Sequence, residues 1–163
     1  LLLSKLESQQ FVVEKTHYAL DEQIKCCAIL LYRKCEAKKI TLSADLIPAI
    51  YNGNEEMMRH VWINLLDNAV KYTPEGGEIN ITMSEDDKTI SVSIADTGIG
   101  MSTEVCAHMF DKSYQGDSSH TGKGLGLGLS IVGRIIELCG GNIEVESTPR
   151  YGSTFTVVLP KIA

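Results

Sequence analysis

Three separated segments of this sequence combine amides, charges and glycines at spacings that could form one ligand site. In the first segment, Asn64, Asn68 and Lys71 stand at positions i, i+4 and i+7, so on a helix they share one stripe and point toward one place. In the second segment, Asp96 ends a run of alternating apolar residues and begins the sequence DTGIGM. Each segment alone is a weak signal, but together they predict one pocket.

Glycines shape the second and third segments. Gly98 and Gly100 lack a Cβ atom, so the backbone after Asp96 can approach a flat ligand closely. The third segment, GKGLGLGLSI at 122–131, alternates glycine with leucine and continues into an apolar helix. This form brings free backbone N–H groups and a helix N-terminus toward phosphate. The candidate residues of the third segment are Lys123, Gly124, Leu125, Gly126, Leu127 and Gly128.

The chemistry of these side chains fits ATP with a magnesium ion. Mg²⁺ prefers hard oxygen ligands, and the carboxamide of Asn68 supplies one without adding a negative charge that repels phosphate. Lys71 can reach a phosphate as a point charge. Ionised Asp96 only accepts hydrogen bonds, so it suits the exocyclic amino group of adenine and rejects guanine, which has a carbonyl there. Tyr72 offers an aromatic face beside the purine.

Each segment also has an ordinary structural explanation. Asn64 and Asn68 could be solvated residues of an exposed helix, and Asp96 could only begin a turn after a strand. The glycine–leucine run could be a kinked helix in the core. The ligand-site interpretation is favoured because all three segments occur in one chain and in this order.

Hydrophobic periodicity predicts the elements that position these residues. Strands are expected at 11–15, 39–45 and 47–53, and in four alternating segments at 78–84, 89–94, 143–145 and 155–159. Helices are expected from Tyr18 to about Lys38, from Glu55 to Tyr72 after an Asn54 cap, over Thr103–Met109, and from about Gly126 to Cys139 before Gly140 and Gly141. The expected class is α+β, as a two-layer α/β sandwich whose mixed, largely antiparallel sheet is covered on one face by three helices.

Composition narrows the possible partners. With 163 residues, of which 44% are hydrophobic, the chain can bury one core, and its net charge of −6 argues against nucleic acid. No apolar run approaches the roughly 20 residues of a membrane span, so we expect no direct membrane contact. The five cysteines lack zinc-ligand spacing; Cys27 falls on an apolar helix stripe, which indicates a buried thiol and a reducing compartment.

The motifs resemble those of the ATP-binding catalytic domain of bacterial sensor histidine kinases, within the GHKL superfamily that also contains gyrase, mismatch-repair and heat-shock chaperone ATPases. The segment NLLDNAVKYTPEGG resembles the family's N box, and it places Asn64, Asn68, Lys71 and Tyr72 at the family's functional positions. DTGIGM resembles the G1 box and GKGLGLGLSI the G2 box. MFDKSYQGD resembles the F box, anchored on Phe110. The resemblance covers residues 9–163.

This resemblance implies a transfer reaction and its partners. The γ-phosphoryl group of ATP would pass to a histidine on dimerisation and phosphoacceptor helices, and then to a response-regulator aspartate. None of the four histidines here lies in the family's acceptor motif. Residues 1–8 resemble the tail of the preceding dimerisation helix, and about 101–125 would form an ATP lid. The resemblance also implies a cytoplasmic location, as the intracellular part of a membrane-anchored sensor.

Asn64 distinguishes branches of the superfamily, and the F box departs from the family pattern. ATPases and anti-sigma-type serine kinases of the superfamily carry a glutamate where this chain has Asn64, and an amide cannot act as a general base. The chain therefore resembles the kinases, with Asn64 and Lys71 as the catalytic candidates. Family F boxes usually read Phe-Tyr-Arg where this chain has Ser113-Tyr114-Gln115. A degenerate module that binds ATP without transferring phosphate is therefore the alternative, together with a serine kinase or ATPase of the superfamily.

Overall fold

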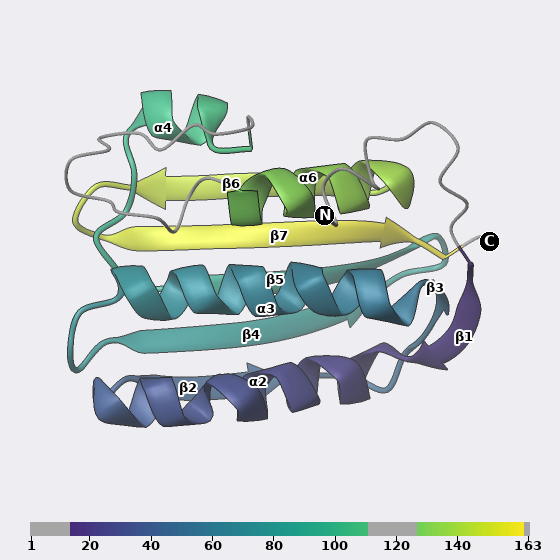
Figure 1. The fold of residues 1–163 in the computed structure, drawn as a ribbon, viewed down its shortest axis with the longest axis horizontal. Helices are drawn as coiled ribbons and strands as arrows, with labels where there is room; N and C mark the ends of the chain where they lie inside the picture. The colour runs from purple at the N-terminus through teal and green to yellow at the C-terminus, as the bar shows by residue number, and fades with distance from the viewer. Residues whose placement is uncertain (1–13, 111–126, 162–163) are drawn as a thin grey trace.

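A five-stranded mixed sheet forms one layer of the molecule (Figure 1). The computed structural model describes residues 14–110 and 127–161. The strands, in their order across the sheet, are β2 (Thr41–Asp45), β4 (Glu78–Glu85), β5 (Thr89–Asp96), β7 (Gly152–Pro160) and β6 (Asn142–Thr148). Only the β2–β4 pair within this sheet is parallel, and the other three pairs are antiparallel. The predicted mixed, largely antiparallel sheet is therefore confirmed.

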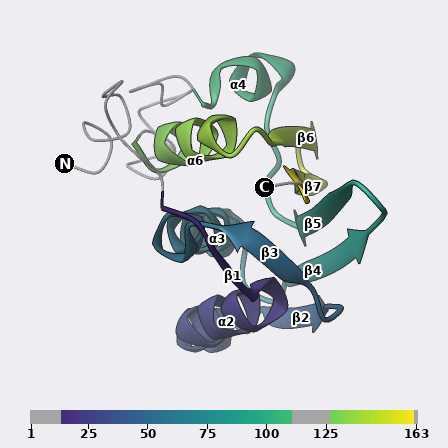
Figure 2. The same ribbon diagram turned by 90° about the vertical axis from the view of Figure 1, so that its right-hand side faces the viewer.

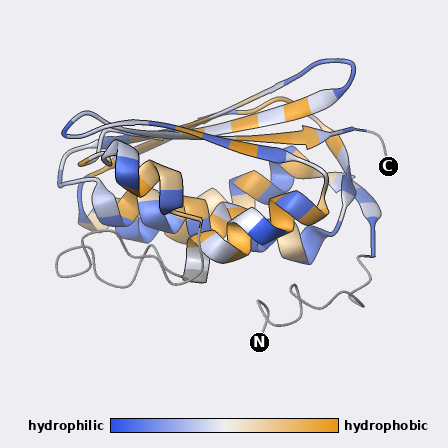
Figure 3. Cartoon of the chain, turned by 90° about the horizontal axis from the view of Figure 1, so that it is seen from above, coloured by the Kyte–Doolittle hydropathy of each residue, from blue (hydrophilic) through white to orange (hydrophobic). Residues whose placement is uncertain are grey.

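Three long helices form the second layer on one face of the sheet (Figure 2). They are α2 (Leu20–Ala37), α3 (Glu55–Tyr72) and α6 (Leu127–Leu138), and the short α4 (Thr103–His108) lies beside β6. Figure 3 shows the two layers from above, and they confirm the predicted sandwich. Among the described residues, no helix has the length and apolar composition needed to cross a bilayer.

The core lies between these layers and follows the predicted periodicities. Side chains of the sheet alternate between the core and the opposite face, as expected for period-two patterning. The buried strand residues include Ile79, Ile81, Met83, Ile90, Val92, Ile94, Phe155, Val157 and Leu159. The predicted stripe of α3 is buried at Met58, Val61, Trp62, Leu65 and Ala69. All five cysteines are free thiols, and Cys27 is 2% exposed, which confirms the buried-thiol interpretation.

The beginning of the described chain differs from the prediction. A strand was expected at 11–15, but residues 14 and 15 are not in a strand, 11–13 lie outside the described residues, and β1 spans Thr16–Ala19. β1 pairs antiparallel with β3 (Ile50–Gly53), so the backbone of Tyr18 is in a strand and α2 begins only at Leu20. The prediction, which followed the apolar residues 11–13, was wrong because pairing with β3 decides where the strand lies.

Both ends of α3 are capped, which fixes the helix that carries most of the predicted site. At the N-terminus, the Asn54 side chain accepts a hydrogen bond from the backbone N–H of Met57 at 2.9 Å, as its N-cap role predicts. At the C-terminus, the Lys38 ammonium group donates to the carbonyl oxygens of Val70 at 2.7 Å and Lys71 at 3.3 Å. A cation there also complements the helix dipole.

Gln23 links α2 to the N-terminal half of α3 through a buried hydrogen-bond network. Its carboxamide oxygen accepts from the indole N–H of Trp62 at 2.9 Å and from the Tyr18 hydroxyl at 3.3 Å. Its nitrogen donates to the carbonyl oxygen of Glu55 at 2.7 Å. Because the Trp62 side chain is fully buried, its N–H depends on this partner.

Replacing Gln23 should therefore destabilise the domain. Gln23→Met keeps the length of the side chain but leaves the Trp62 N–H unpaired, so we expect a loss of about 2 kcal/mol in the free energy of unfolding. Urea denaturation followed by tryptophan fluorescence measures this loss. Glu22→Met is the matched control, because Glu22 is the exposed neighbour on the same helix. Equal unfolding midpoints for the two variants would contradict this role of Gln23.

Candidate nucleotide site

A cavity of about 140 Å³ lies where the C-terminal half of α3 meets the ends of β5 and β7. Four predicted site residues from two separate segments line it: Asn68, Tyr72, Asp96 and Gly100. The rest of its wall is mostly apolar, with Ala69, Ile99, Met101, Val105 and Phe155 among the lining residues. The structure thus brings the N-box helix and the loop after β5 to one concave surface, as the sequence predicts.

Asp96 places a carboxylate in this apolar cavity. Its Oδ1 atom accepts a hydrogen bond from the backbone N–H of Gly98 at 2.8 Å. Burial raises the pKa of Asp96 above its ordinary value, although backbone N–H groups of Gly98 and Ser153 oppose this rise. A desolvated acceptor of this kind binds most strongly to a ligand that donates a hydrogen bond.

The loop after Asp96 is held so closely that two of its positions require glycine. A Cβ atom on Gly98 would lie 2.3 Å from the carbonyl oxygen of Tyr72. Gly100 has a φ of +69°, and a Cβ atom there would lie 2.0 Å from the Thr148 carbonyl oxygen. Between them, the Ile99 N–H donates to the Tyr72 carbonyl at 3.0 Å. The loop is therefore fixed against the end of α3 on one side and the end of β6 on the other.

Asn68 presents an amide group that the protein leaves unpaired. The residue is 6% exposed, and within the described part of the chain its side-chain nitrogen has no hydrogen-bond partner. A buried polar atom without a partner is costly, and such atoms are rare in folded proteins. Because Asn68 also lines the cavity, its amide is available to a ligand there.

Asn64 lies one turn before Asn68 but faces the start of α6. Its side-chain nitrogen donates to the carbonyl oxygen of His60 at 2.6 Å. A Cβ atom on Gly128 would lie only 2.9 Å from the Asn64 Oδ1 atom. The first and third sequence segments therefore meet at Asn64 and Gly128, next to the cavity lining rather than within it.

Lys71 lies outside the cavity lining and forms an ion pair on the helix surface. Its ammonium group is 3.2 Å from Asp67 Oδ2, and the Lys34 ammonium group of α2 is 3.1 Å from Asp67 Oδ1. Burial alone would raise the pKa of Asp67, but hydrogen bonds from Lys34 and Lys71 outweigh burial and lower it. The structure thus places Lys71 against Asp67, while its phosphate-binding role stays a prediction.

Phe110 anchors the F-box segment beside the cavity. The Phe110 ring meets the ring of Phe155 edge-to-face, with centroids 6.5 Å apart. Phe110 also lies against α6, since a Cβ atom on Gly133 would be 3.4 Å from the Cβ atom of Phe110. Phe155 itself lines the cavity. The predicted residues Lys123, Gly124, Leu125 and Gly126 lie outside the described residues, and Leu127 begins α6.

Sequence reasoning missed Ser153, which is 7% exposed and lines the cavity. Ser153 pairs with Asp96 across the β5–β7 ladder, so the two side chains lie on the same face of the sheet. One signal could have found it. In the alternating series that continues through Phe155, Val157 and Leu159, Ser153 is a polar residue at a position that points inward.

The sequence matches a known family over most of its length. A family model described as "Histidine kinase-, DNA gyrase B-, and HSP90-like ATPase" matches residues 53–163. The chain belongs to this family. The match begins at the end of β3 and includes every residue of the cavity lining, so the site lies within the matched region.

Two curated relatives of this family member are named as sensor proteins. The heme sensor protein HssS of Staphylococcus saprophyticus is 35% identical over 99% of this chain and 35% of its own length. The phosphate regulon sensor protein PhoR of Pseudomonas aeruginosa is 34% identical over 96% of this chain and 36% of its own length. The chain thus spans about a third of the length of these relatives.

Solved structures of histidine kinases share the fold of this family member. The catalytic domain of histidine kinase ThkA has a TM-score of 0.82 at 28% identity, covering 91% of this chain and 96% of its own. ShkA, full-length in complex with AMPPNP, has a TM-score of 0.86 at 26% identity, covering 99% of this chain and 34% of its own. The chain therefore has the fold of a histidine kinase catalytic domain.

The raised pKa of Asp96 predicts how stability depends on pH. A carboxyl group whose pKa is raised in the folded chain binds its proton more tightly there than in the unfolded chain. Its contribution to the free energy of unfolding is therefore fully present below the ordinary pKa of 3.8 and is lost as pH rises through the folded pKa. Asp96→Asn removes the buried charge, so we expect it to raise the free energy of unfolding near neutral pH. The extra stability of Asp96→Asn should vanish below pH 3.8. Urea denaturation of both proteins at several pH values from neutral to below 3.8 measures this difference.

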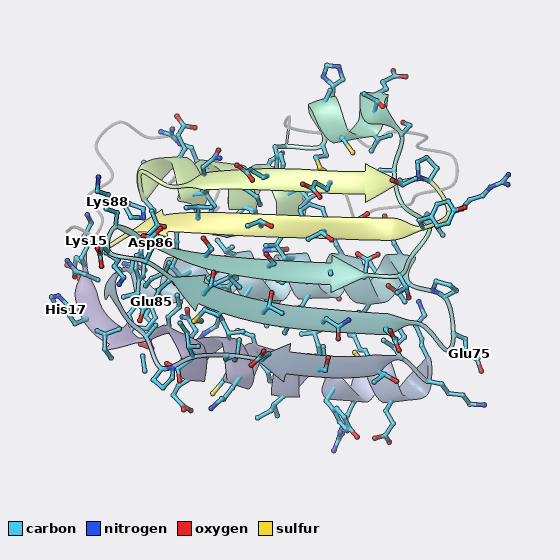
Figure 4. All side chains as sticks on the ribbon, turned by 180° about the vertical axis from the view of Figure 1, so that it is seen from behind. Lys15, His17, Glu75, Glu85, Asp86 and Lys88 are labelled. Atoms are coloured by element: carbon cyan, nitrogen blue, oxygen red, sulfur yellow. The ribbon has the colours of Figure 1, made fainter. Side chains whose placement is uncertain are left out.

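Asp86, in the turn that leads into β5, is the matched control of opposite sign (Figure 4). Its exposed carboxylate accepts from the backbone N–H groups of Lys88 at 2.8 Å and Thr89 at 2.7 Å, which lower its pKa. Its stabilisation is present above pH 3.8 and is lost as pH falls through the folded pKa, so Asp86→Asn should lower stability near neutral pH. Changes of the same sign in both variants would contradict the burial argument for Asp96.

Proposed function

We propose that this chain is the ATP-binding catalytic domain of a two-component sensor histidine kinase. It transfers the γ-phosphoryl group of ATP to a histidine on phosphoacceptor helices that this chain does not contain. The observation that carries the proposal is the convergence of Asp96 and Asn68 on one apolar cavity, each with unused capacity for a ligand. The family match, the sensor-protein relatives and the fold shared with the histidine kinase ThkA support it.

Adenine fits the end of the cavity formed by Asp96. Its flat ring fills the space between apolar side chains such as Ile99, Met101 and Phe155, which line the cavity. Its exocyclic amino group donates to the Asp96 carboxylate, and a purine with a carbonyl at that position meets a repulsive acceptor instead. Tyr72 adds an aromatic surface from the end of α3. The site therefore selects adenine nucleotides.

Asn68 is the protein ligand that we assign to Mg²⁺. Among the described residues, no cluster of three or more His, Cys, Asp or Glu side chains could hold a metal. Mg²⁺ commonly keeps several waters and phosphate oxygens beside one protein ligand, so a single amide would suit it. The Asn68 amide, buried and with an unpaired nitrogen, fits such a site because rotating it presents its oxygen instead. When bound, the ion neutralises charge on the phosphates.

The residues beside the phosphate end favour transfer over hydrolysis. Asn64 occupies the place at which a general base would act on water, and an amide cannot accept that proton. Its position against Gly128 joins α3 to the glycine-rich segment, to which we assign the phosphates. Lys71 would exchange its Asp67 partner for a phosphate oxygen. The domain then contributes positioning and charge neutralisation, and the histidine nucleophile comes from elsewhere.

The partners follow from the relatives. One solved structure contains histidine kinase ThkA in complex with response regulator protein TrrA, and ThkA there has a TM-score of 0.81 at 26% identity to this chain. We propose that the present protein likewise passes its phosphoryl group to a response regulator. ATP and such regulators are found in the cytoplasm, so we assign this domain to the cytoplasmic part of a sensor.

Asn68→Ala tests the proposed metal ligand. We expect it to abolish Mg²⁺-dependent ATP binding, measured by calorimetry, because the amide is removed from the cavity. Its free energy of unfolding should stay the same or rise, because the variant also removes a buried donor without a partner. Asn142→Ala is the control, since Asn142 is exposed on β6. Unchanged ATP affinity in Asn68→Ala would refute the assignment.

A transfer assay separates the kinase from the degenerate alternative that Ser113 and Gln115 suggest, two residues that lie outside the described part of the chain. The chain is incubated with γ-labelled ATP and a phosphoacceptor domain from a sensor kinase relative. We expect label on the acceptor that is stable to base and labile to acid, as for phosphohistidine, and little release of free phosphate. ATP binding without any transfer would support the binding-only module.

A further inference from the structure

Ser147, near the end of β6, makes three hydrogen bonds behind the cavity. Its Oγ atom accepts from the backbone N–H of Met101 at 2.7 Å. It donates to the carbonyl oxygen of Gly152 at 3.0 Å. It also lies 2.8 Å from the hydroxyl oxygen of Ser153. One hydroxyl thus joins the loop after β5, the first residue of β7 and a side chain of the cavity wall.

Counting protons fixes the direction of these bonds. A serine hydroxyl has one proton to donate and two lone pairs to accept with. The Gly152 carbonyl can only accept, so it takes the single proton of Ser147. The Met101 N–H can only donate, so it uses one lone pair of Ser147. The bond between the two serines must therefore use the proton of Ser153.

This direction determines what Ser153 offers to a ligand. Because its proton points to Ser147, the hydroxyl of Ser153 presents only lone pairs to the cavity. Ser153 pairs with Asp96 across the β5–β7 ladder, and both residues line the cavity. This end of the cavity therefore presents two acceptors, a carboxylate and a hydroxyl oxygen, and no side-chain donor from this pair.

We infer that Ser147 is a positioning residue for base selection, which holds the Ser153 hydroxyl as an acceptor beside Asp96. The inference rests on the proposed nucleotide function. A purine with an amino group at C6 is accepted by both oxygens, whereas a carbonyl at C6 is repelled by both. Without Ser147, the Ser153 hydroxyl rotates and donates its proton to such a carbonyl. Ser147 thus controls selectivity without touching the ligand.

Inosine triphosphate provides the matching probe, because it carries a carbonyl at C6 in place of the amino group of ATP. The measured quantity is the ratio of the Kd for inosine triphosphate to the Kd for ATP, obtained by calorimetry in Mg²⁺. We expect Ser147→Ala to lower this ratio by about tenfold relative to the wild type. A merely structural role would loosen the cavity, weaken both nucleotides alike and leave the ratio unchanged.

Two further variants separate the hydroxyl from the shape of the side chain. Ser147→Thr keeps the hydroxyl, so it should keep the wild-type ratio. Valine has nearly the same shape as threonine but no hydroxyl, so Ser147→Val should behave like Ser147→Ala. Both are β-branched and suit a strand, so they serve if Ser147→Ala folds poorly. Ser93→Ala is the matched control: it removes a similar hydroxyl pair, Ser93 with Thr156 at 3.0 Å, from a position that does not line the cavity.

The outcomes distinguish this inference from the proposed function. If the wild type binds neither nucleotide, the proposed function fails and the inference fails with it. If the wild type prefers ATP but Ser147→Val retains the full ratio, only the role of Ser147 is refuted. A reduced ratio in Ser93→Ala would also refute the role of Ser147, because removing a hydroxyl elsewhere in the sheet would then have the same effect on selectivity. The expected pattern is a fall confined to the Ala and Val variants of Ser147.

Discussion

A buried carboxylate is the constraint on which the rest of the site depends. In the proposed function Asp96 contacts its ligand from within an apolar cavity, yet burial raises its pKa and disfavours its charge. Two backbone N–H groups, from Gly98 and Ser153, partly compensate. They are available only because the loop after β5 is tightly folded and because β7 pairs directly with β5. The glycine loop and the strand order thus each supply a donor that favours the charged form of Asp96.

The scaffold compensates elsewhere for what the site leaves unsatisfied. The cavity contains a carboxylate with a raised pKa and an Asn68 amide nitrogen that has no partner in the described part of the chain. Both features reduce stability and both suit ligand binding. The helix that carries Asn68 is capped at both ends and tied to α2 through Gln23 and Trp62. Rigid support for α3 lets the site keep unpaired groups without losing its geometry.

Local sequence patterns, such as caps and apolar periodicity, predicted most of the helices and strands. They could not predict which distant strands pair with one another. The Asn54 cap and the apolar stripe of α3 are local, so the sequence predicted its limits at Glu55 and Tyr72. The alternation of β7 marks Ser153 as an inward polar residue, but its pairing with Asp96 and the role of Ser147 arise from the registers of β5 with β7 and of β6 with β7, which no local pattern contains. The sequence pattern assigned Lys71 to phosphate, and only the structure shows its ammonium group against Asp67.

The arrangement of α3 explains why binding and chemistry can be divided between domains. The C-terminal half of the helix meets the cavity to which we assign adenine through Asn68 and Tyr72, and Asn64, one turn earlier, faces Gly128 at the start of α6. The helix therefore spans from the base to the segment assigned to phosphate. In the proposed complex with ATP, an amide at Asn64 would leave the terminal phosphoryl group without an activated water nearby. Under the proposed function, a site built in this way holds ATP intact until a nucleophile from another domain reaches it.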